Sequence, residues 1–364
     1  MQAGIVAGHF RGGRSDEVSY MIDGIPVNDA YGGVAAVSTL EVESVKDLEV
    51  ITGTFNAEYG NAMSGVVNAV TKDGSNEFHG SLNSAYSTYI TDNKRNGEKV
   101  YIGLDPFGIN SNSDFRFNLS GPIIKDRLYF FSNFRTQGIN GHLNGIRRFN
   151  VWNLSNFYDQ DSSKWYSENT GDSAFVPMNK GNYSSLMGKV SLDLGNLRLS
   201  WMLNNNYSQS RGYSHVYKYN PDGRSYSDAN TSLVMFQLNH FLNEKMFYDI
   251  KYSITDNNYG SYVFEDYDSY EVIKEDGIYQ GVYRFEGDTV YNYVNDKYMT
   301  AFGTGFFTGG QDKGYTKRAT VSNNFKTTFN WQATNAHSIK AGVSATFYDL
   351  KNTYHTIRNA YAGT

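Results

Sequence analysis

Alternating apolar and polar residues form the clearest pattern in the last three quarters of the chain. Between residues 315 and 331 the odd positions include Val321, Phe325 and Trp331, whereas every even position is polar. Because successive side chains of a strand point to opposite faces, this segment predicts a strand with one apolar face and one polar face. Similar, sometimes weaker patterns predict nine strands, near residues 77–90, 113–120, 127–136, 183–194, 197–207, 231–242, 245–256, 315–332 and 337–350.

The connections between these predicted strands alternate strictly between short and long. The short ones, at residues 121–126, 195–196, 243–244 and 333–336, carry the Gly, Asn, Asp and Pro residues that favour tight hairpins. The long ones span roughly residues 91–112, 137–182, 208–230 and 257–314. All short turns must therefore lie on one side of the sheet, as in outer-membrane barrels, whose periplasmic turns are brief and whose extracellular loops are long. The Tyr-rich connection 257–314 is typical of an adaptable binding surface.

Composition narrows the class of protein further. The chain has 364 residues, 16% of them aromatic, and no cysteine, which removes disulfides, zinc fingers and thiol chemistry. No apolar run approaches the roughly 18 residues of a spanning helix, and a net charge of -5 predicts no nucleic-acid partner. The strands of a soluble β-sandwich or a repetitive adhesin would also show alternating apolar and polar residues. The one-sided long loops, and aromatic residues near strand ends such as Trp201 and Trp331, favour a transmembrane β-barrel.

Residues 1–76 follow a different pattern and predict a small α+β domain. Short apolar segments at residues 18–25, 45–52 and 65–71 are separated by glycine-rich and acidic stretches. A short helix is expected near Thr39–Val45, which has Glu41 and Glu43 early in its sequence. The Asp23-Gly24 pair after an apolar segment predicts a tight turn in which glycine supplies a positive φ.

Three segments carry a resemblance to one family. Residues 11–27 read RGGRSDEVSYMIDGIPV, and residues 48–72 contain LEVITG, AEYGN and GVVNAVTK in that order. Residues 121–131 read GPIIKDRLYFF. Together, in this order and spacing, they resemble TonB-dependent outer-membrane receptors, in which a plug domain closes a large barrel. The second segment is more similar to the Bacteroidetes-like branch with a carboxypeptidase-regulatory-like domain than to SusC-type importers.

The resemblance implies how the chain is divided. Residues 1–76 would be the C-terminal part of a plug domain, and residues 77–364 the N-terminal part of a transmembrane β-barrel. Small barrels of about eight strands are filled by their own side chains, whereas those with about 22 strands hold a plug. We therefore expect a large antiparallel barrel that is incomplete here. A signal peptide, the segment that binds TonB and the first half of the plug are expected to precede this chain.

The resemblance also implies a function and partners. It predicts a receptor in the outer membrane of a Gram-negative bacterium that takes up a scarce nutrient such as a siderophore, cobalamin, an oligosaccharide or a peptide. The expected partners are the TonB-ExbB-ExbD complex, outer-membrane lipids and an extracellular ligand. SusC-type importers, which work with a surface lipoprotein lid, tend to carry an LKDA…AIYG run before the last plug strand, whereas residues 48–60 here read LEVITGTFNAEYG. A surface lipoprotein partner is therefore in doubt. The alternative is a surface adhesin or structural barrel of the same fold that transports nothing.

No motif of enzyme chemistry occurs in the sequence, and we expect no catalytic residues, no metal site and no cofactor. Substrate contacts are expected instead on two plug loops that face outward in the family. Tyrosine can stack and donate a hydrogen bond, and arginine can hold a carboxylate with two bonds. The expected substrate-binding residues are Arg14, Ser15, Asp16, Asn28, Asp29 and Tyr31. The residues expected to shape the plug are Arg11, Gly12, Asp23, Gly24, Tyr59, Gly60 and Gly65.

Overall fold

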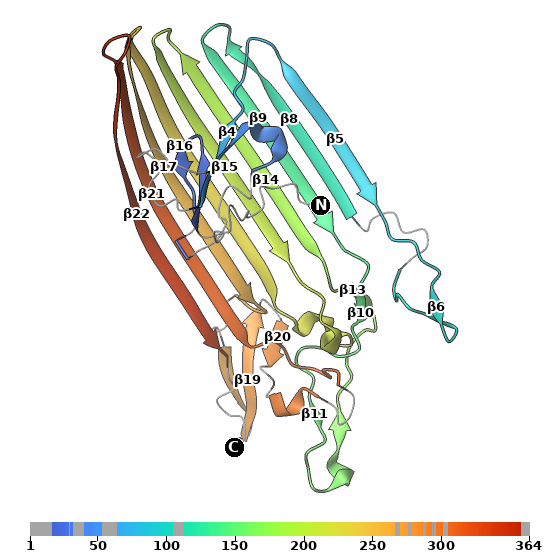
Figure 1. Cartoon of the computed structure of the whole chain (residues 1–364). Coiled ribbons are helices and arrows are strands. Elements are labelled where there is room, and N and C mark those ends of the chain that lie inside the picture. Colours follow the sequence, from blue (N-terminus) through green and yellow to red (C-terminus); the bar gives the residue numbers. More distant parts are fainter. Residues whose placement is uncertain are drawn as a thin grey trace.

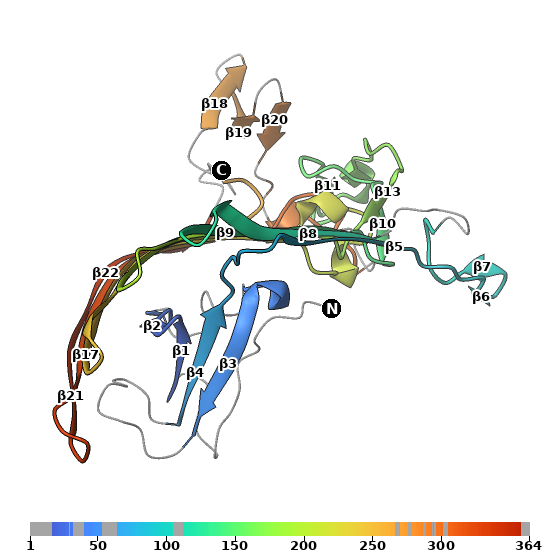
Figure 2. The ribbon, with the colours of Figure 1, turned by 90° about the horizontal axis from the view of Figure 1, so that it is seen from above.

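A small sheet lies on the concave face of a large curved sheet (Figures 1 and 2). The computed structural model describes residues 17–28, 30–31, 40–52, 64–104, 112–265, 270–275, 278–286, 289–292, 294, 296–300 and 305–357. Within these residues no helix is both long enough and apolar enough to cross a membrane.

The large sheet has nine strands, and each strand is antiparallel to its neighbours. In spatial order they are β5 (His79–Ser87), β8 (Asn112–Ile124), β9 (Leu128–Ile139), β14 (Gly181–Asp193), β15 (Leu197–Ser210), β16 (Tyr226–Asn243), β17 (Met246–Tyr262), β21 (Gly314–Gln332) and β22 (Ser338–Thr356). Spatial order follows chain order, so every connection joins adjacent strands. The four short turns gather at one end of the sheet and the long connections at the other (Figure 1). The predicted nine-stranded antiparallel sheet is confirmed.

The long connections are more structured than the sequence indicates. β16 and β17 extend beyond residues 231–242 and 245–256, so Tyr259 and Tyr262 lie in a strand and not in a loop. The connections also form small sheets of their own. These pair β6 (Lys94–Arg95) with β7 (Glu98–Lys99), β10 (Asn144–Ile146) with β13 (Phe175–Pro177), β11 (Ser155–Asn156) with β12 (Tyr166–Ser167), and β18 (Tyr270–Glu275), β19 (Ile278–Glu286) and β20 (Thr289–Asn292) in a row. The described parts of the long connections also contain the 3-10 turns η4 (Ser162–Lys164), η5 (His215–Tyr217), η6 (Pro221–Gly223) and η7 (Asp296–Tyr298).

The small sheet has the order β2-β1-β4-β3. Its strands are β1 (Val18–Ile22), β2 (Ile25–Pro26), β3 (Val45–Ile51) and β4 (Gly65–Thr71). β1 and β4 run parallel, and both end toward the short-turn end of the large sheet, where the chain passes from β4 into β5. The helix expected near Thr39–Val45 is only a 3-10 turn, η3 (Val42–Ser44), because strand β3 begins directly after it.

Strand register sorts the side chains of the large sheet into rows on its two faces. Trp201, Phe236, Tyr252 and Phe325 are successive cross-strand partners from β15 to β21, and all four are exposed on the convex face. The next row on the concave face runs through Met202, Met235, Ser253 and Asn324, and all four are buried. An apolar outer face and a largely polar inner face are the arrangement expected of a barrel wall in a membrane.

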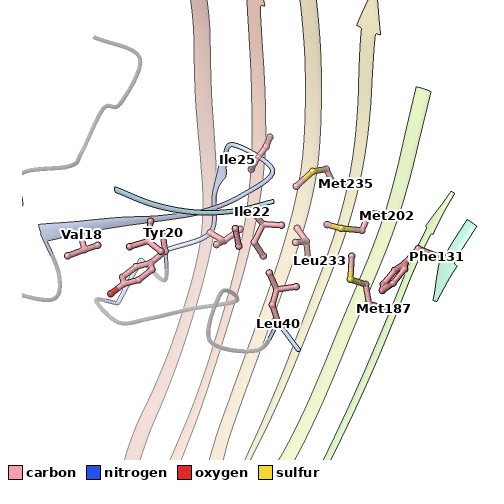
Figure 3. Packing of buried hydrophobic residues seen from close by; sticks show 13 residues of the cluster. Val18, Tyr20, Ile22, Ile25, Leu40, Phe131, Met187, Met202, Leu233 and Met235 are labelled. Carbon is pink, nitrogen blue, oxygen red and sulfur yellow. The ribbon is translucent and has the colours of Figure 1, made fainter. Parts of the chain in front are cut away.

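The main hydrophobic core lies between the small sheet and the concave wall (Figure 3). Four neighbouring wall strands contribute apolar side chains to it, and three of the five residues are methionines, whose flexible side chains fill irregular gaps. The wall residues are Phe131, Met187, Met202, Leu233 and Met235; the residues facing them from the small sheet and its flanks are Val18, Tyr20, Ile22, Ile25, Val27, Leu40, Val67 and Ala69.

The two edges of the large sheet are open. β5 is exposed along its whole length, and β22 along most of its 19 residues, with large apolar side chains such as Val343 and Phe347 uncovered. An unpaired strand edge presents a row of free backbone donors and acceptors, and barrels remove such edges by closing. The sheet is therefore an arc of wall and not a closed barrel.

Candidate functional site

The Asp23-Gly24 turn is one of the places at which the wall binds the small sheet through polar contacts. It joins β1 to β2 with φ values of 48° and 80°, so both residues adopt the left-handed conformation typical of a two-residue hairpin turn. Asp23 Oδ1 accepts a hydrogen bond from Thr71 N (2.8 Å) and Asp23 Oδ2 accepts one from Thr71 Oγ1 (2.6 Å). The aspartate thereby fixes the end of β4 to the turn, which agrees with the tight turn predicted here.

Three lysines of the concave wall reach this turn. Lys251 Nζ donates to Asp23 O (2.6 Å), and Lys326 Nζ donates to Gly24 O (3.1 Å). Lys189 Nζ donates to Thr71 Oγ1 (2.9 Å) and lies 3.5 Å from Asp23 Oδ2. The lysines come from β17, β21 and β14, so the turn is held from several strands at once.

The segment that leaves β4 is bound to the same region of the wall. Asp73 Oδ1 accepts from Ser191 Oγ (2.8 Å) and lies 3.3 Å from Lys189 Nζ. Its other carboxylate oxygen lies 3.0 Å from an Arg198 guanidinium nitrogen. Lys189 thus faces two carboxylates, one in the hairpin turn and one in the connection to β5.

A second set of charges joins η3 to strands β8 and β9. Arg135 donates to Glu41 Oε2 (3.1 Å) and to both oxygens of Asp114 (3.0 and 2.8 Å). Arg116 donates to Glu43 Oε1 (2.9 Å) and also to Asp114. The Arg135 side chain is only 2% exposed and that of Glu41 6%. These five residues, here called the arginine network, join the small sheet to the wall through a buried pair, Arg135 and Glu41, and a half-buried pair, Arg116 and Glu43.

A polar cavity of about 360 Å³ opens between the small sheet and the wall beside the Asp23-Gly24 turn. Its floor includes Asn68, whose side-chain oxygen accepts from Gly24 N (2.9 Å). Wall strands β14 to β17 contribute Lys189, Arg198, Ser200, Gln237, Asn239 and Lys251; the small sheet and the connection after it contribute Asp23, Gly24, Lys46, Asn68, Val70, Thr71 and Asp73.

The structure describes four of the residues singled out in the sequence besides Asp23. Gly24 is in the turn, and Gly65 begins β4 opposite Val18. The Asn28 amide donates to Val18 O (2.8 Å) and accepts from Tyr20 N (2.9 Å), so it is bonded to the edge of β1. The Arg318 guanidinium lies over the Tyr31 ring, and its central carbon is 5.7 Å from the ring centroid. Arg11, Gly12, Arg14, Ser15, Asp16, Asp29, Tyr59 and Gly60 lie outside the described residues.

The sequence did not single out the wall residues that hold the turn. Lys189, Lys251 and Lys326 alternate with apolar neighbours and resemble the solvated charges of any half-buried strand. A charged residue at an inward-facing position of a predicted barrel strand indicates that an ion pair could form there. The sequence does not indicate which residue would be its partner. The arginine network was missed for the same reason.

The long connections hold a separate group of ion pairs at the opposite end of the sheet. Arg147 binds Asp222 (2.6 Å) and Asp172 (2.9 Å), and hydrogen bonding to Asp222 raises the pKa of this arginine above its ordinary value. Tyr217 donates to Asp312, and burial together with that carboxylate raises the pKa of the tyrosine hydroxyl. These contacts join connections that are far apart in the sequence.

Comparison with known proteins agrees with this architecture. Residues 7–66 match the family described as TonB-dependent Receptor Plug Domain. The chain is 41% identical over 125 residues to the TonB-dependent transporter Oar of Myxococcus xanthus, which covers 34% of this chain and 12% of Oar. It is 32% identical over 131 residues to the probable TonB-dependent siderophore receptor PirA of Acinetobacter baumannii, which covers 33% of this chain and 15% of that protein. The chain therefore matches less than a fifth of either relative's length.

The fold has a counterpart among solved structures. The outer membrane transporter YddB from Escherichia coli superimposes with a TM-score of 0.53 at 14% identity, over 93% of this chain and 41% of YddB. The arc of nine strands with a small sheet on its concave face is thus the fold of a plugged outer-membrane barrel. Residues 7–66 therefore resemble the plug domain of TonB-dependent receptors, and strands β5 to β22 have the fold of an outer-membrane barrel wall. Its relatives are transporters and receptors, not enzymes.

Proposed function

We propose that the protein containing this chain imports a scarce nutrient through the plugged barrel, with energy supplied by TonB. The observation that carries this proposal is the way the plug is held. Besides the hydrophobic contact, ion pairs and hydrogen bonds join it to the wall at the Asp23-Gly24 turn and at the arginine network. Such contacts have defined partners and can be broken and re-formed, as a plug that opens and closes requires.

The proposed energy source is the TonB-ExbB-ExbD complex, acting on a segment N-terminal to the residues described. The proposed division places the plug in residues 1–76 and the barrel in residues 77–364. Candidate cargoes are a siderophore, cobalamin, an oligosaccharide or a peptide, and the name of the Acinetobacter relative supports the first of these. A surface lipoprotein lid is not part of the proposal, because residues 48–60 differ from the corresponding run of SusC-type importers.

Ligand contacts are proposed for the outward plug loops, at Arg14, Ser15, Asp16, Asn28, Asp29 and Tyr31. Support comes from Tyr31, which lies against Arg318 near the end of β21 that faces the long connections. Arg318 also lies 4.9 Å above the Tyr259 ring, so two tyrosines and an arginine meet there. Stacked tyrosine and arginine side chains provide both apolar contact and hydrogen-bond donors.

The alternative function is that of an adhesin or structural barrel that keeps its plug closed. Uptake assays separate the two. Cells with the full-length gene, and a deletion strain, are supplied with defined iron, cobalamin, glycan and peptide sources, each in a TonB-positive and a TonB-null background. We expect TonB-dependent growth or uptake on one source only when the gene is present. No difference between the strains on any source would overturn the transport proposal.

Replacing Tyr31 with alanine is expected to weaken ligand binding by about 1–2 kcal/mol, or roughly 5- to 30-fold in affinity, because a stacked aromatic contact is removed. The measurement is the concentration for half-maximal uptake of the nutrient identified above. Tyr354→Ala is the control, since Tyr354 lies exposed on β22. If wild type and Tyr31→Ala reach half-maximal uptake at the same nutrient concentration, Tyr31 does not contact the ligand.

A further inference from the structure

The wall beside the plug turn carries two lysines in one cross-strand row near the short turns. In one row Ser191, Ser200, Gln237, Lys251 and Lys326 are successive cross-strand partners from β14 to β21. The next row toward the short turns mixes charges and contains Asp193, Arg198, Asn239, Asp249 and Thr328. Charges at such inward positions line the space between plug and wall, because outward positions face the other side of the sheet.

Lys251 and Lys326 are directly opposed on neighbouring strands. Like charges in this position repel each other, so the pair destabilises the sheet unless a negative group or dipole compensates it. In this structure part of the compensation comes from the plug, since the two ammonium groups donate to the backbone carbonyls of Asp23 and Gly24. The Asp249 carboxylate of the wall also attracts Lys251. The turn carbonyls are neutral dipoles, and a plug turn that moved away would leave the pair without them.

The cavity beside this pair has an excess of cations. Lys46, Lys189, Arg198 and Lys251 line it, against the two carboxylates of Asp23 and Asp73. Both carboxylates are already engaged, Asp23 with Thr71 and Lys189 and Asp73 with Lys189 and Arg198. The remaining polar lining includes the neutral residues Gln237 and Asn239. A cavity of about 360 Å³ has room for a carboxylate or phosphate group.

We propose that this cavity and the Lys251–Lys326 pair form an anion-binding subsite on the path between plug and wall, and that the imported nutrient carries carboxylate or phosphate groups. The inference rests on the proposed transport function and adds the chemical class of the cargo. An anionic group can replace the turn carbonyls as the partner of the two lysines. A cation meets repulsion at the same place, so the subsite selects by charge, as rings of basic side chains do in anion pores.

The test measures anion binding to the purified full-length protein. Isothermal titration uses citrate and pyrophosphate as probes, with spermidine as a cationic comparison, at about 0.01 M ionic strength, where charges act over about 30 Å. We expect both anions to bind and spermidine not to bind. The charge-removing pair Lys251→Gln with Lys326→Gln, whose amides can still donate to the turn, should weaken anion binding about tenfold or more. The tighter probe identifies carboxylate or phosphate as the preferred group.

Two further variants separate charge from folding. Lys251→Arg with Lys326→Arg keeps both charges and should retain most of the anion affinity. Lys245→Gln, in the exposed turn between β16 and β17, removes a charge outside the cavity and should change nothing. Anion affinity that is unaltered in the glutamine pair would overturn the inference, while TonB-dependent uptake would leave the proposed function standing. Charge-dependent binding without TonB-dependent uptake would support the subsite and overturn the transport proposal instead.

Discussion

Replacing Arg135 with alanine is expected to weaken the docking of the plug against the wall by about 3–5 kcal/mol. The substitution leaves Glu41, buried at the plug surface, without its cationic partner, and it removes the two hydrogen bonds from Arg135 to Asp114. The Tyr183 hydroxyl, which is also hydrogen-bonded to Glu41, cannot neutralise the charge of that carboxylate. An unpaired buried carboxylate costs more than the original ion pair contributes, because the remaining charge stays out of water. Arg116 still binds Asp114 and Glu43, so the loss falls mainly on Glu41.

Hydrogen exchange of the full-length protein measures this loss. Amides of β3 and β4 should exchange about 100-fold faster or more in the alanine variant, since each 1.4 kcal/mol corresponds to about tenfold. Adding Glu41→Gln should recover part of the protection, because the second substitution removes the buried charge. Arg127→Ala, in the exposed turn between β8 and β9, is the control and should stay within about 0.5 kcal/mol of wild type. Unchanged exchange in β3 and β4 would show that the arginine network does not hold the plug.

Substitution of Asp23 should have the second-largest effect. Asp23→Ala removes the acceptor of two hydrogen bonds from Thr71 and places alanine at a positive φ, for an expected loss of about 2–4 kcal/mol. Asp23→Asn tolerates the same backbone conformation and keeps one acceptor oxygen, so about 1–2 kcal/mol is expected. Lys189 keeps Asp73 as a partner in both variants, which limits the loss.

The exchange of β1 and β4 amides reports this effect. Asp126→Asn is a matched control, because Asp126 also has a positive φ but lies in the exposed turn between β8 and β9. It should leave β1 and β4 unaffected. Equal protection in Asp23→Ala, Asp23→Asn and wild type would mean that the backbone contacts of the turn, which include Lys251, Lys326 and Asn68, hold it without the Asp23 side chain.

The fold class and the direction of the strands can be predicted from the pattern of residues along the chain. Strict alternation on one wall face, as in residues 315–331, and short turns such as Gly195-Asn196 require only neighbours in the chain, so they are visible without a structure. The positive φ of Gly24 follows from its place in a two-residue turn. The lengths of β16 and β17 could not be predicted, because their outer ends are polar on both faces and are fixed by pairing with neighbouring strands.

The contacts between plug and wall cannot be predicted from the pattern of residues, because they depend on how distant segments pack together. Arg135 and Glu41 are 94 residues apart, and Lys326 meets Gly24 across 302 residues. A charged residue at an inward strand position looks the same in sequence whether it faces water or a partner. Register across the sheet sets which charges form one row, and the docking of the plug sets which of them are neutralised. The lysine pair and the arginine network therefore form only when the strands have this register and the plug is docked against the wall.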